Sequence, residues 1–300
     1  MRPLFTTGSA RWWLLGTAVL QLVSPAVIPF DGGSARDLPV VPPSFFFGIW
    51  SVITIGCVAA AAWGMPQSRA SRPPYRRVQM PVSVVQVLFI VWLVLARFLP
   101  PLTVLVFATM LALLTYAMKV VVSSPADRVT RVLLGGSLGL YAGWTAGAVW
   151  LNLVTVLPLE VQGDRAVLAT ALLAAAATCV SGALFFRGSA GFVVGATWAC
   201  MGILLTSAMA GEVGLAAVAA AGLLATLIAG ALASRRHRTS TAQPPREGRE
   251  TAAPGRPRLA ACISCASDRG GGSEVSGVTD AVVLDIRTPR RRATGAAESS

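Results

Sequence analysis

The segment GLYAGWTAGAVWLN, residues 139–152, contains the pattern that decides the fold. It lies inside a long apolar stretch and carries three glycines spaced four residues apart. Two overlapping G-x-x-x-G units of this kind let a second helix approach closely within a membrane. At about 100° per residue, five residues share a different side of the same helix. These are Tyr141, Trp144, Ala148, Leu151 and Asn152. The segment therefore predicts a membrane helix with a glycine packing seam on one side and an aromatic and amide face on another.

The composition around this segment is that of a membrane protein. The chain has 300 residues, of which 54% are hydrophobic and 13% charged, whereas soluble domains carry about 25% charged residues. The net charge of +12 is interpreted as the positive bias of cytoplasmic loops and tail, and not as a nucleic-acid surface. Lys119 is the only lysine, and this preference for arginine indicates a bacterium with a GC-rich genome.

Eight segments are long and apolar enough to cross a membrane as helices, which takes about 20 residues. The third and fourth are separated by Pro100 and Pro101, which end one helix and begin the next. The first is expected to be retained as a membrane helix, because its apolar run is long and no A-x-A cleavage site follows. The predicted spans are residues 12–30, 44–64, 80–98, 101–122, 132–157, 166–186, 190–210 and 213–233.

Charged residues between the spans predict that both termini are cytoplasmic. With a cytoplasmic N-terminus, the inner segments before the C-terminal tail carry ten basic residues and one acidic residue. The outer segments carry three basic and five acidic residues. Every loop thus follows the positive-inside rule. The expected location is the plasma (inner) membrane of a bacterium, with Arg235 and Arg236 contacting anionic lipid beyond the last span.

The spans hold few residues suited to acid–base or metal chemistry. No Asp, Glu, Lys or His lies near the centre of a span, which argues against an ion-coupled carrier but leaves a uniporter open. The only histidine, His237, follows the last span. Cys262 and Cys265 form a single C-x-x-C pair in the tail, whereas a zinc site needs about four ligands. We therefore expect no metal site and no enzymatic activity, and an enzyme acting on lipids or isoprenoids is the least favoured class.

Aromatic residues are the main candidates for ligand binding. The second span begins with VPPSFFFGIW, in which Phe46 and Phe47 precede Trp50 by four and three residues, and these aromatic residues are expected on one side. Tryptophans within the spans, such as Trp92 and Trp144, need a partner for the indole N–H that lipid tails do not provide. We expect them to face other helices or a cavity, and helix packing alone is the alternative interpretation.

These two stretches resemble the TspO/MBR family, the tryptophan-rich sensory proteins related to the mitochondrial translocator protein. The fifth helix of that family carries Tyr-x-x-Trp-x-x-x-Ala-x-x-Leu-Asn, and the GLYAGWTAGAVWLN segment matches every element at the same spacing. The family's proline before the tyrosine is a leucine here. Pro42, Phe47 and Trp50 match the proline-rich, aromatic start of the second helix. Gln86 and Trp92 match the third helix only loosely, since its Asn and paired-Phe signature is missing.

The resemblance covers roughly residues 12–157 and implies a bundle of five helices. We therefore expect an all-α polytopic membrane protein in three parts. A TspO-like bundle would occupy residues 1–158, three additional transmembrane helices residues 159–234, and a disordered, basic cytoplasmic tail residues 235–300. The glycines expected at helix contacts are Gly139, Gly143, Gly147, Gly191 and Gly195.

The resemblance also implies a function. Members of the family bind porphyrins, haem or related tetrapyrroles, some bind sterols, and they often form dimers. We expect this chain to bind, sense or transport a flat hydrophobic ligand such as a porphyrin or haem, to contact membrane lipid, and to form a homodimer. A permease or uniporter that uses all eight helices is the alternative. The expected ligand-binding residues are Phe46, Phe47, Trp50, Trp92, Tyr141, Trp144, Ala148 and Asn152.

Overall fold

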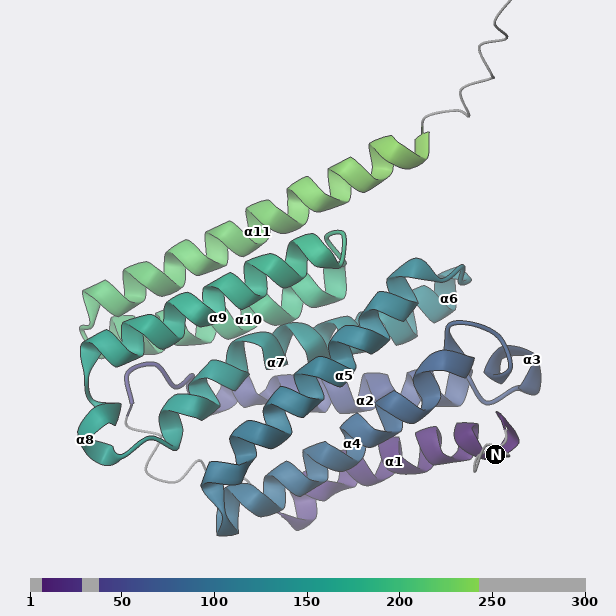
Figure 1. Ribbon diagram of the computed structural model, residues 1–300, viewed down its shortest axis with the longest axis horizontal. Helices are drawn as coiled ribbons and strands as arrows, with labels where there is room; N and C mark the ends of the chain where they lie inside the picture. The colour runs from purple at the N-terminus through teal and green to yellow at the C-terminus, as the bar shows by residue number, and fades with distance from the viewer. Residues whose placement is uncertain (1–6, 29–37, 243–300) are drawn as a thin grey trace, which may run out of the picture. The chain divides into compact units, whose positions relative to one another are not determined.

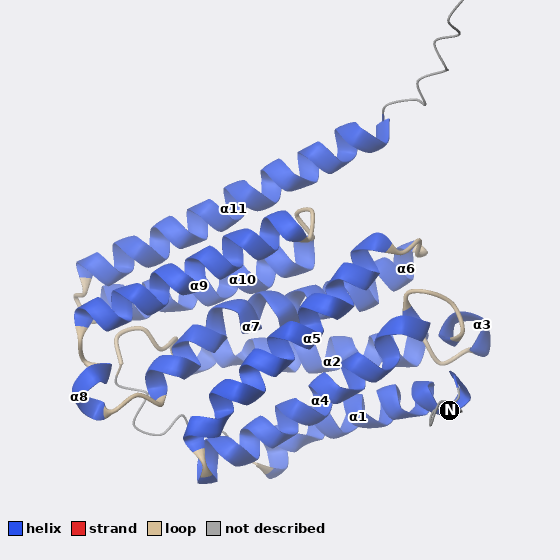
Figure 2. Cartoon of the chain, viewed as in Figure 1, coloured by secondary structure: helices blue, strands red, loops and turns tan. Residues whose placement is uncertain are grey.

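The computed structural model describes residues 7–28 and 38–242, which are helices joined by short loops (Figure 1). No strand occurs in these two ranges (Figure 2). They belong to one compact unit of the chain. The disordered tail was predicted to begin at residue 235, but residues 235–242 are helical. The rest of that tail, from residue 243 onward with the Cys262 and Cys265 pair, lies outside the described residues.

Eight long helices form the described part of the protein, and shorter turns join or extend them. The long helices are α1 (Thr7–Val27), α2 (Ile49–Trp63), α4 (Tyr75–Phe98), α5 (Thr103–Ser123), α7 (Gly136–Thr155), α9 (Arg165–Phe185), α10 (Ala190–Met209) and α11 (Val213–Ala242). The short elements are η2 (Ser44–Gly48), α3 (Gln67–Ala70), η3 (Pro100–Leu102), α6 (Arg128–Thr130), η4 (Arg131–Gly135) and α8 (Leu159–Gln162). Of these, η2 and η3 are 3-10 turns and η4 is a π turn.

Seven helices in the described ranges are long and apolar enough to cross a membrane, counting the turns that extend α2, α5 and α7. The helix outside this set is α1, whose 21 residues are long enough at about 1.5 Å per residue but less apolar. Gln21 and Ser24 are among its buried residues, and α1 packs along α2 and α4. The protein is therefore an all-α, multi-pass membrane protein, and the predicted fold class is confirmed.

Prolines set several of the helix starts. Pro43 precedes η2, which continues into α2, and Pro100 begins η3, which continues into α5. A missing backbone N–H and a fixed φ suit proline to the first turn of a helix. The helix α4 begins at Tyr75, after Pro74 and five residues before the predicted span. Its first residues are mostly polar, so a prediction based on apolar runs did not include them.

Five glycines lie where α7 and α10 meet: Gly139, Gly143 and Gly147 on α7, and Gly191 and Gly195 on α10. A Cβ added at Gly143 would lie 2.7 Å from the Ala196 backbone N, and one at Gly195 would lie 2.9 Å from the Trp144 backbone N. Backbone atoms cannot rotate away as a side chain can. Glycine is therefore what permits this close contact between the two helices.

Helix α7 connects the first five long helices with the last three. It packs against α2 and α5, and also against α9 and α10. Residues 136–147 of α7 are almost entirely buried, so both of its sides are covered by protein. The glycine seam faces α10, which leaves the aromatic side of α7 to meet α2, α4 and α5.

Candidate ligand-binding site

Aromatic rings from four helices meet on the side of α7 that faces α2 and α4. Trp50 of α2 lies at the centre, with its ring centroid 4.6 Å from Phe89, 5.3 Å from Tyr141, 6.2 Å from Trp92 and 6.3 Å from Trp144. Two further rings extend the group from η2 and α5. We name it the aromatic cluster: Phe47, Trp50, Phe89, Trp92, Phe107, Tyr141 and Trp144.

The aromatic cluster is closed upon itself. Tyr141 and Trp144 meet the Trp50 ring edge-on, at interplanar angles of 89° and 84°, an arrangement that aromatic pairs favour. Trp50, Tyr141 and Trp144 are 8%, 0% and 2% exposed, so the rings fill the space between them. Phe47 of the cluster and Ala148, four residues after Trp144 on α7, are only partly buried, and we call these two residues the rim. Two of the predicted ligand-binding residues are therefore accessible at the rim, while the central ones pack against each other.

Asn152 holds three helices together through its amide. The Trp92 Nε1 donates to Asn152 Oδ1 at 3.3 Å, and Asn152 Nδ2 donates to Thr103 Oγ1 at 2.8 Å. These partners lie on α4 and α5. The amide that was expected to bond a ligand thus makes helix-to-helix hydrogen bonds in this structure, and a ligand would have to replace one of them.

Trp144 differs from three other tryptophans of the bundle in its indole N–H. Trp92 donates to Asn152, Trp150 donates to Thr178 Oγ1 at 2.9 Å, and Trp198 donates to the Phe46 carbonyl at 3.0 Å. The Nε1 of Trp144 is buried, and no atom of the described residues accepts a hydrogen bond from it. An unpaired buried donor of this kind is disfavoured by about 1–3 kcal/mol.

Phe46 lies apart from the aromatic cluster, which differs from the expectation that it shares one side with Trp50. Its ring packs on Trp198 of α10, with centroids 4.7 Å apart. The cause is local, because residues 44–48 form a 3-10 turn and not an α-helix. A 3-10 turn advances about 120° per residue, so Phe46 points toward α10 while Phe47 meets Trp144 at 5.8 Å.

Several residues around the cluster were not anticipated from the sequence. Phe89 is three residues before Trp92 on α4, and this helical spacing is a signal that could have identified it. Phe107 contacts Trp92 across helices, with centroids 5.2 Å apart, and no local pattern indicates that pairing. Gln21 of α1 donates from Nε2 to the Tyr141 hydroxyl at 3.1 Å, a contact that spans 120 residues of sequence.

One end of the bundle carries a polar network in which Asp127 is the acidic member. Its carboxylate accepts from the Thr130 backbone N at 2.5 Å and from Thr130 Oγ1 at 3.1 Å. The backbone hydrogen bond, then the hydroxyl, then the charge of Arg69 lower the pKa of Asp127 from its usual value. Trp63 Nε1 donates to Thr130 Oγ1 at 3.1 Å, and Arg69 stacks on the Trp63 ring at 3.6 Å. The network joins α2, α3 and α6.

No set of three or more His, Cys, Asp or Glu side chains gathers into a metal site within residues 7–28 and 38–242. The aromatic rings and single polar groups gathered on α2, α4, α5 and α7 suit binding through aromatic surfaces and single hydrogen bonds. Within the aromatic cluster, the partly exposed rim and the unpaired indole N–H of Trp144 are available to an organic ligand.

Comparison with known families gives a match over most of the chain. The model of the family described as TSPO-like protein matches residues 33–230. Comparisons with curated proteins and with solved structures gave no match. The family match begins after α1 and includes α9, α10 and most of α11, so it differs in extent from the resemblance over residues 12–157. Because it covers well over half of the sequence, this chain belongs to the TSPO-like protein family.

Proposed function

We propose that the protein is a non-catalytic membrane protein that binds a flat hydrophobic ligand of the tetrapyrrole class at the aromatic cluster. The observation that carries this proposal is the unpartnered indole N–H of Trp144, buried among aromatic rings in a TSPO-like chain. A ligand that places an acceptor beside Trp144 Nε1 would remove a penalty of about 1–3 kcal/mol. Stacking of a flat ring system on indoles would add apolar contact.

Binding requires the aromatic cluster to open, because its rings occupy the space between α2, α4 and α7. The rim is the natural point of entry, since Phe47 and Ala148 are partly accessible and Phe47 touches Trp144 edge-on. The closed arrangement is then the ligand-free state, and a ligand would select an open one. The apparent affinity then equals the intrinsic affinity multiplied by the fraction of molecules that are open.

A porphyrin titration tests the proposal. The full-length protein in lipid nanodiscs would be titrated with protoporphyrin IX while the Soret absorbance is followed. The Trp144→Phe variant keeps a ring but removes the N–H, and the loss of one buried hydrogen bond of about 1.4 kcal/mol predicts about a tenfold weaker Kd. The matched control is Trp150→Phe on the same helix, whose N–H already bonds Thr178 and whose removal should leave the Kd unchanged.

Two results would refute binding at this site. The first is the absence of saturable binding by the wild-type protein. The second is an equal effect of the two tryptophan variants on Kd, which would place the porphyrin elsewhere. If binding is observed, uptake of the same porphyrin into proteoliposomes would distinguish a carrier from a receptor, since a receptor binds the porphyrin without net transfer.

We further propose a bacterial inner membrane with cytoplasmic termini. The turns α3 and α6 and the start of α1 lie at one end of the bundle, and α8 lies at the other (Figure 1). Exposed arginines such as Arg72, Arg76 and Arg128 belong to the α3 and α6 end, whereas Glu160 belongs to α8. This distribution supports the orientation by the positive-inside rule. Reporter fusions after residue 242, active only in the cytoplasm, would test it.

A further inference from the structure

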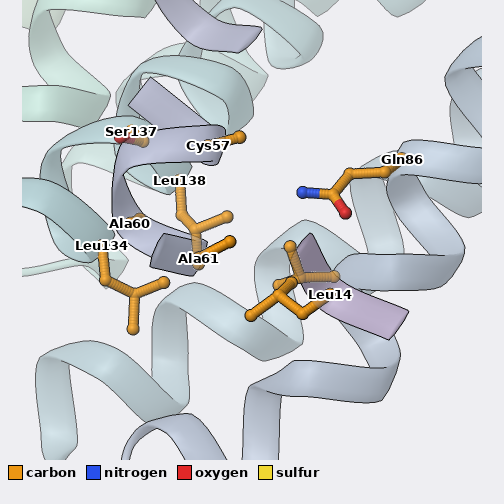
Figure 3. A pocket seen from close by; sticks show the side chains of 9 residues that line it. Leu14, Cys57, Ala60, Ala61, Gln86, Leu134, Ser137 and Leu138 are labelled. Atoms are coloured by element: carbon orange, nitrogen blue, oxygen red, sulfur yellow. The ribbon is translucent and has the colours of Figure 1, made fainter. Parts of the chain in front are cut away.

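A small cavity lies between α1, α2, α4 and α7 (Figure 3). Its volume is about 10 Å³. Apolar side chains form most of its wall, and three polar residues complete it: Cys57, Gln86 and Ser137. None of the rings of the aromatic cluster lines this cavity, so it is a separate feature of the bundle.

Gln86 is the most informative residue of the wall. It is 0% exposed, and its Oε1 lies 2.6 Å from Thr17 Oγ1 of α1, whose single proton is shared between this oxygen and the Trp13 carbonyl at 2.8 Å. Its Nε2 has no hydrogen-bond partner at an oxygen or nitrogen atom of the described residues. Figure 3 shows this nitrogen pointing into the cavity, toward the side that carries Cys57. The Gln86 side chain interacts with the Cys57 thiol, but a thiol sulfur is only a weak acceptor. A strong buried donor therefore faces the cavity without an oxygen or nitrogen acceptor among the described residues.

The opposite wall offers an acceptor. Ser137 Oγ donates to the Leu133 carbonyl at 2.5 Å, which uses its proton and leaves its lone pairs available. The wall residue Leu134 belongs to the π turn η4, just before Ser137. Such turns interrupt the regular helix ladder and occur frequently at functional sites. A Cβ added at Gly56 of α2 would lie 2.5 Å from Ser137 Oγ, so glycine at this position leaves room for the hydroxyl.

We propose that this cavity binds a single water molecule, which accepts from Gln86 Nε2 and donates toward Ser137 Oγ and Cys57 Sγ. The volume of the cavity limits the ligand to a single water molecule, because one water needs about 10–15 Å³. The wall is mostly apolar, but it offers the two or more hydrogen-bonding partners that a buried water needs. The water would extend the hydrogen bond between Thr17 and Gln86, and so link α1 and α4 to α2 and α7. A tetrapyrrole cannot enter this space, so the proposal is independent of ligand binding at the aromatic cluster.

Direct observation of the water is the primary test. Magnetisation transfer from water to the Gln86 side-chain amide would be measured by NMR on the full-length protein in nanodiscs, with the signal assigned by its loss in Gln86→Met. We expect a cross-peak at the water frequency for Gln86. The comparison amide is Gln79 on the same helix, 1% exposed, whose Nε2 already donates to the Ala70 carbonyl at 3.3 Å. No transfer to Gln86, or transfer no stronger than to Gln79, would overturn the proposal.

A second test compares the Tm of two variants, and the presence of the water decides which variant is less stable. In a hydrated cavity the Gln86 amide is bonded at both ends, so Gln86→Met should lower the Tm by more than Thr17→Val. The Thr17→Val change removes the hydroxyl contacts to Gln86 and to the Trp13 carbonyl but keeps the Gln86 amide in place. We expect an extra decrease of about 2–4 °C. In a dry cavity Gln86→Met would remove an unpaired donor. A Tm for Gln86→Met equal to or above that of Thr17→Val would therefore overturn the proposal.

Discussion

Replacement of Gly143 by alanine is the sharpest test of how α7 and α10 pack. A Cβ at this position would contact the Phe192 carbonyl oxygen, and it would lie 2.7 Å from Ala196 N and 3.1 Å from Gly195 C. Ordinary contact begins at 3.4 Å, so the backbones must separate by about 0.7 Å at Ala196 N and by more at Phe192 O. No side-chain rotation can relieve this overlap. We expect Gly143→Ala to destabilise the protein by forcing the two helices apart.

The size of the effect follows from two opposing contributions. Overpacking of a tight contact costs about 1–3 kcal/mol, and a gap of 0.5–1 Å elsewhere along the seam loses about a quarter to a half of the dispersion attraction there. Alanine is the better helix former than glycine by about 0.8–1.0 kcal/mol, which offsets part of the cost. The net result should be a destabilisation of about 2 kcal/mol. That corresponds to a decrease in Tm of about 4–8 °C, measured by thermal unfolding in detergent.

Gly136 on the same helix is the matched control. A Cβ there would meet no atom within 4 Å, so Gly136→Ala should be neutral or raise the Tm slightly through helix propensity. A Gly143→Ala protein that is as stable as Gly136→Ala would refute the close contact between α7 and α10. It would also show that the spacing of the glycines has no role in packing.

Three further changes test the polar contacts. Asn152→Ala removes the amide that accepts from Trp92 and should cost about 1–3 kcal/mol of unfolding free energy, and an unchanged Tm would show that this bridge carries no stability. Trp63→Phe keeps a ring beneath the arginine but removes the N–H that donates to Thr130, so we expect a loss of about 0.5–1.5 kcal/mol by the same assay. The pKa of Asp127 is lowered by its hydrogen bonds to Thr130, so this stabilisation is complete above the unfolded-state pKa and is lost as pH falls through the folded-state pKa. Measured from pH 6 downward, Asp127→Asn should therefore show a smaller acid-dependent decrease in Tm than the wild type, and equal slopes would contradict the assignment.

Much of the molecule can be predicted from its sequence because a membrane imposes strong local constraints. An apolar run of about 20 residues must form a helix in lipid, where every backbone hydrogen bond has to be made within the segment. The number, order and approximate limits of the long helices therefore follow from composition alone, and so does the separation of two faces on α7. Local exceptions escaped prediction, as at residues 44–48, where a 3-10 turn directs Phe46 to α10.

The tertiary structure decided which surfaces meet and what the polar groups do there. The sequence of a helix shows which side chains share a face. It does not show which helix packs against that face, because any apolar helix can cover it. Only the assembled bundle shows that the glycines of α7 contact α10, that Asn152 bonds Trp92 and Thr103, and that Trp144 Nε1 is left unpaired. These outcomes depend on contacts between residues tens of positions apart. The sequence by itself thus determined a helical membrane protein with a small-residue seam and an aromatic face. The packing of helices distant in sequence determined that the aromatic face is closed and that its unpaired hydrogen-bond donor is Trp144 Nε1.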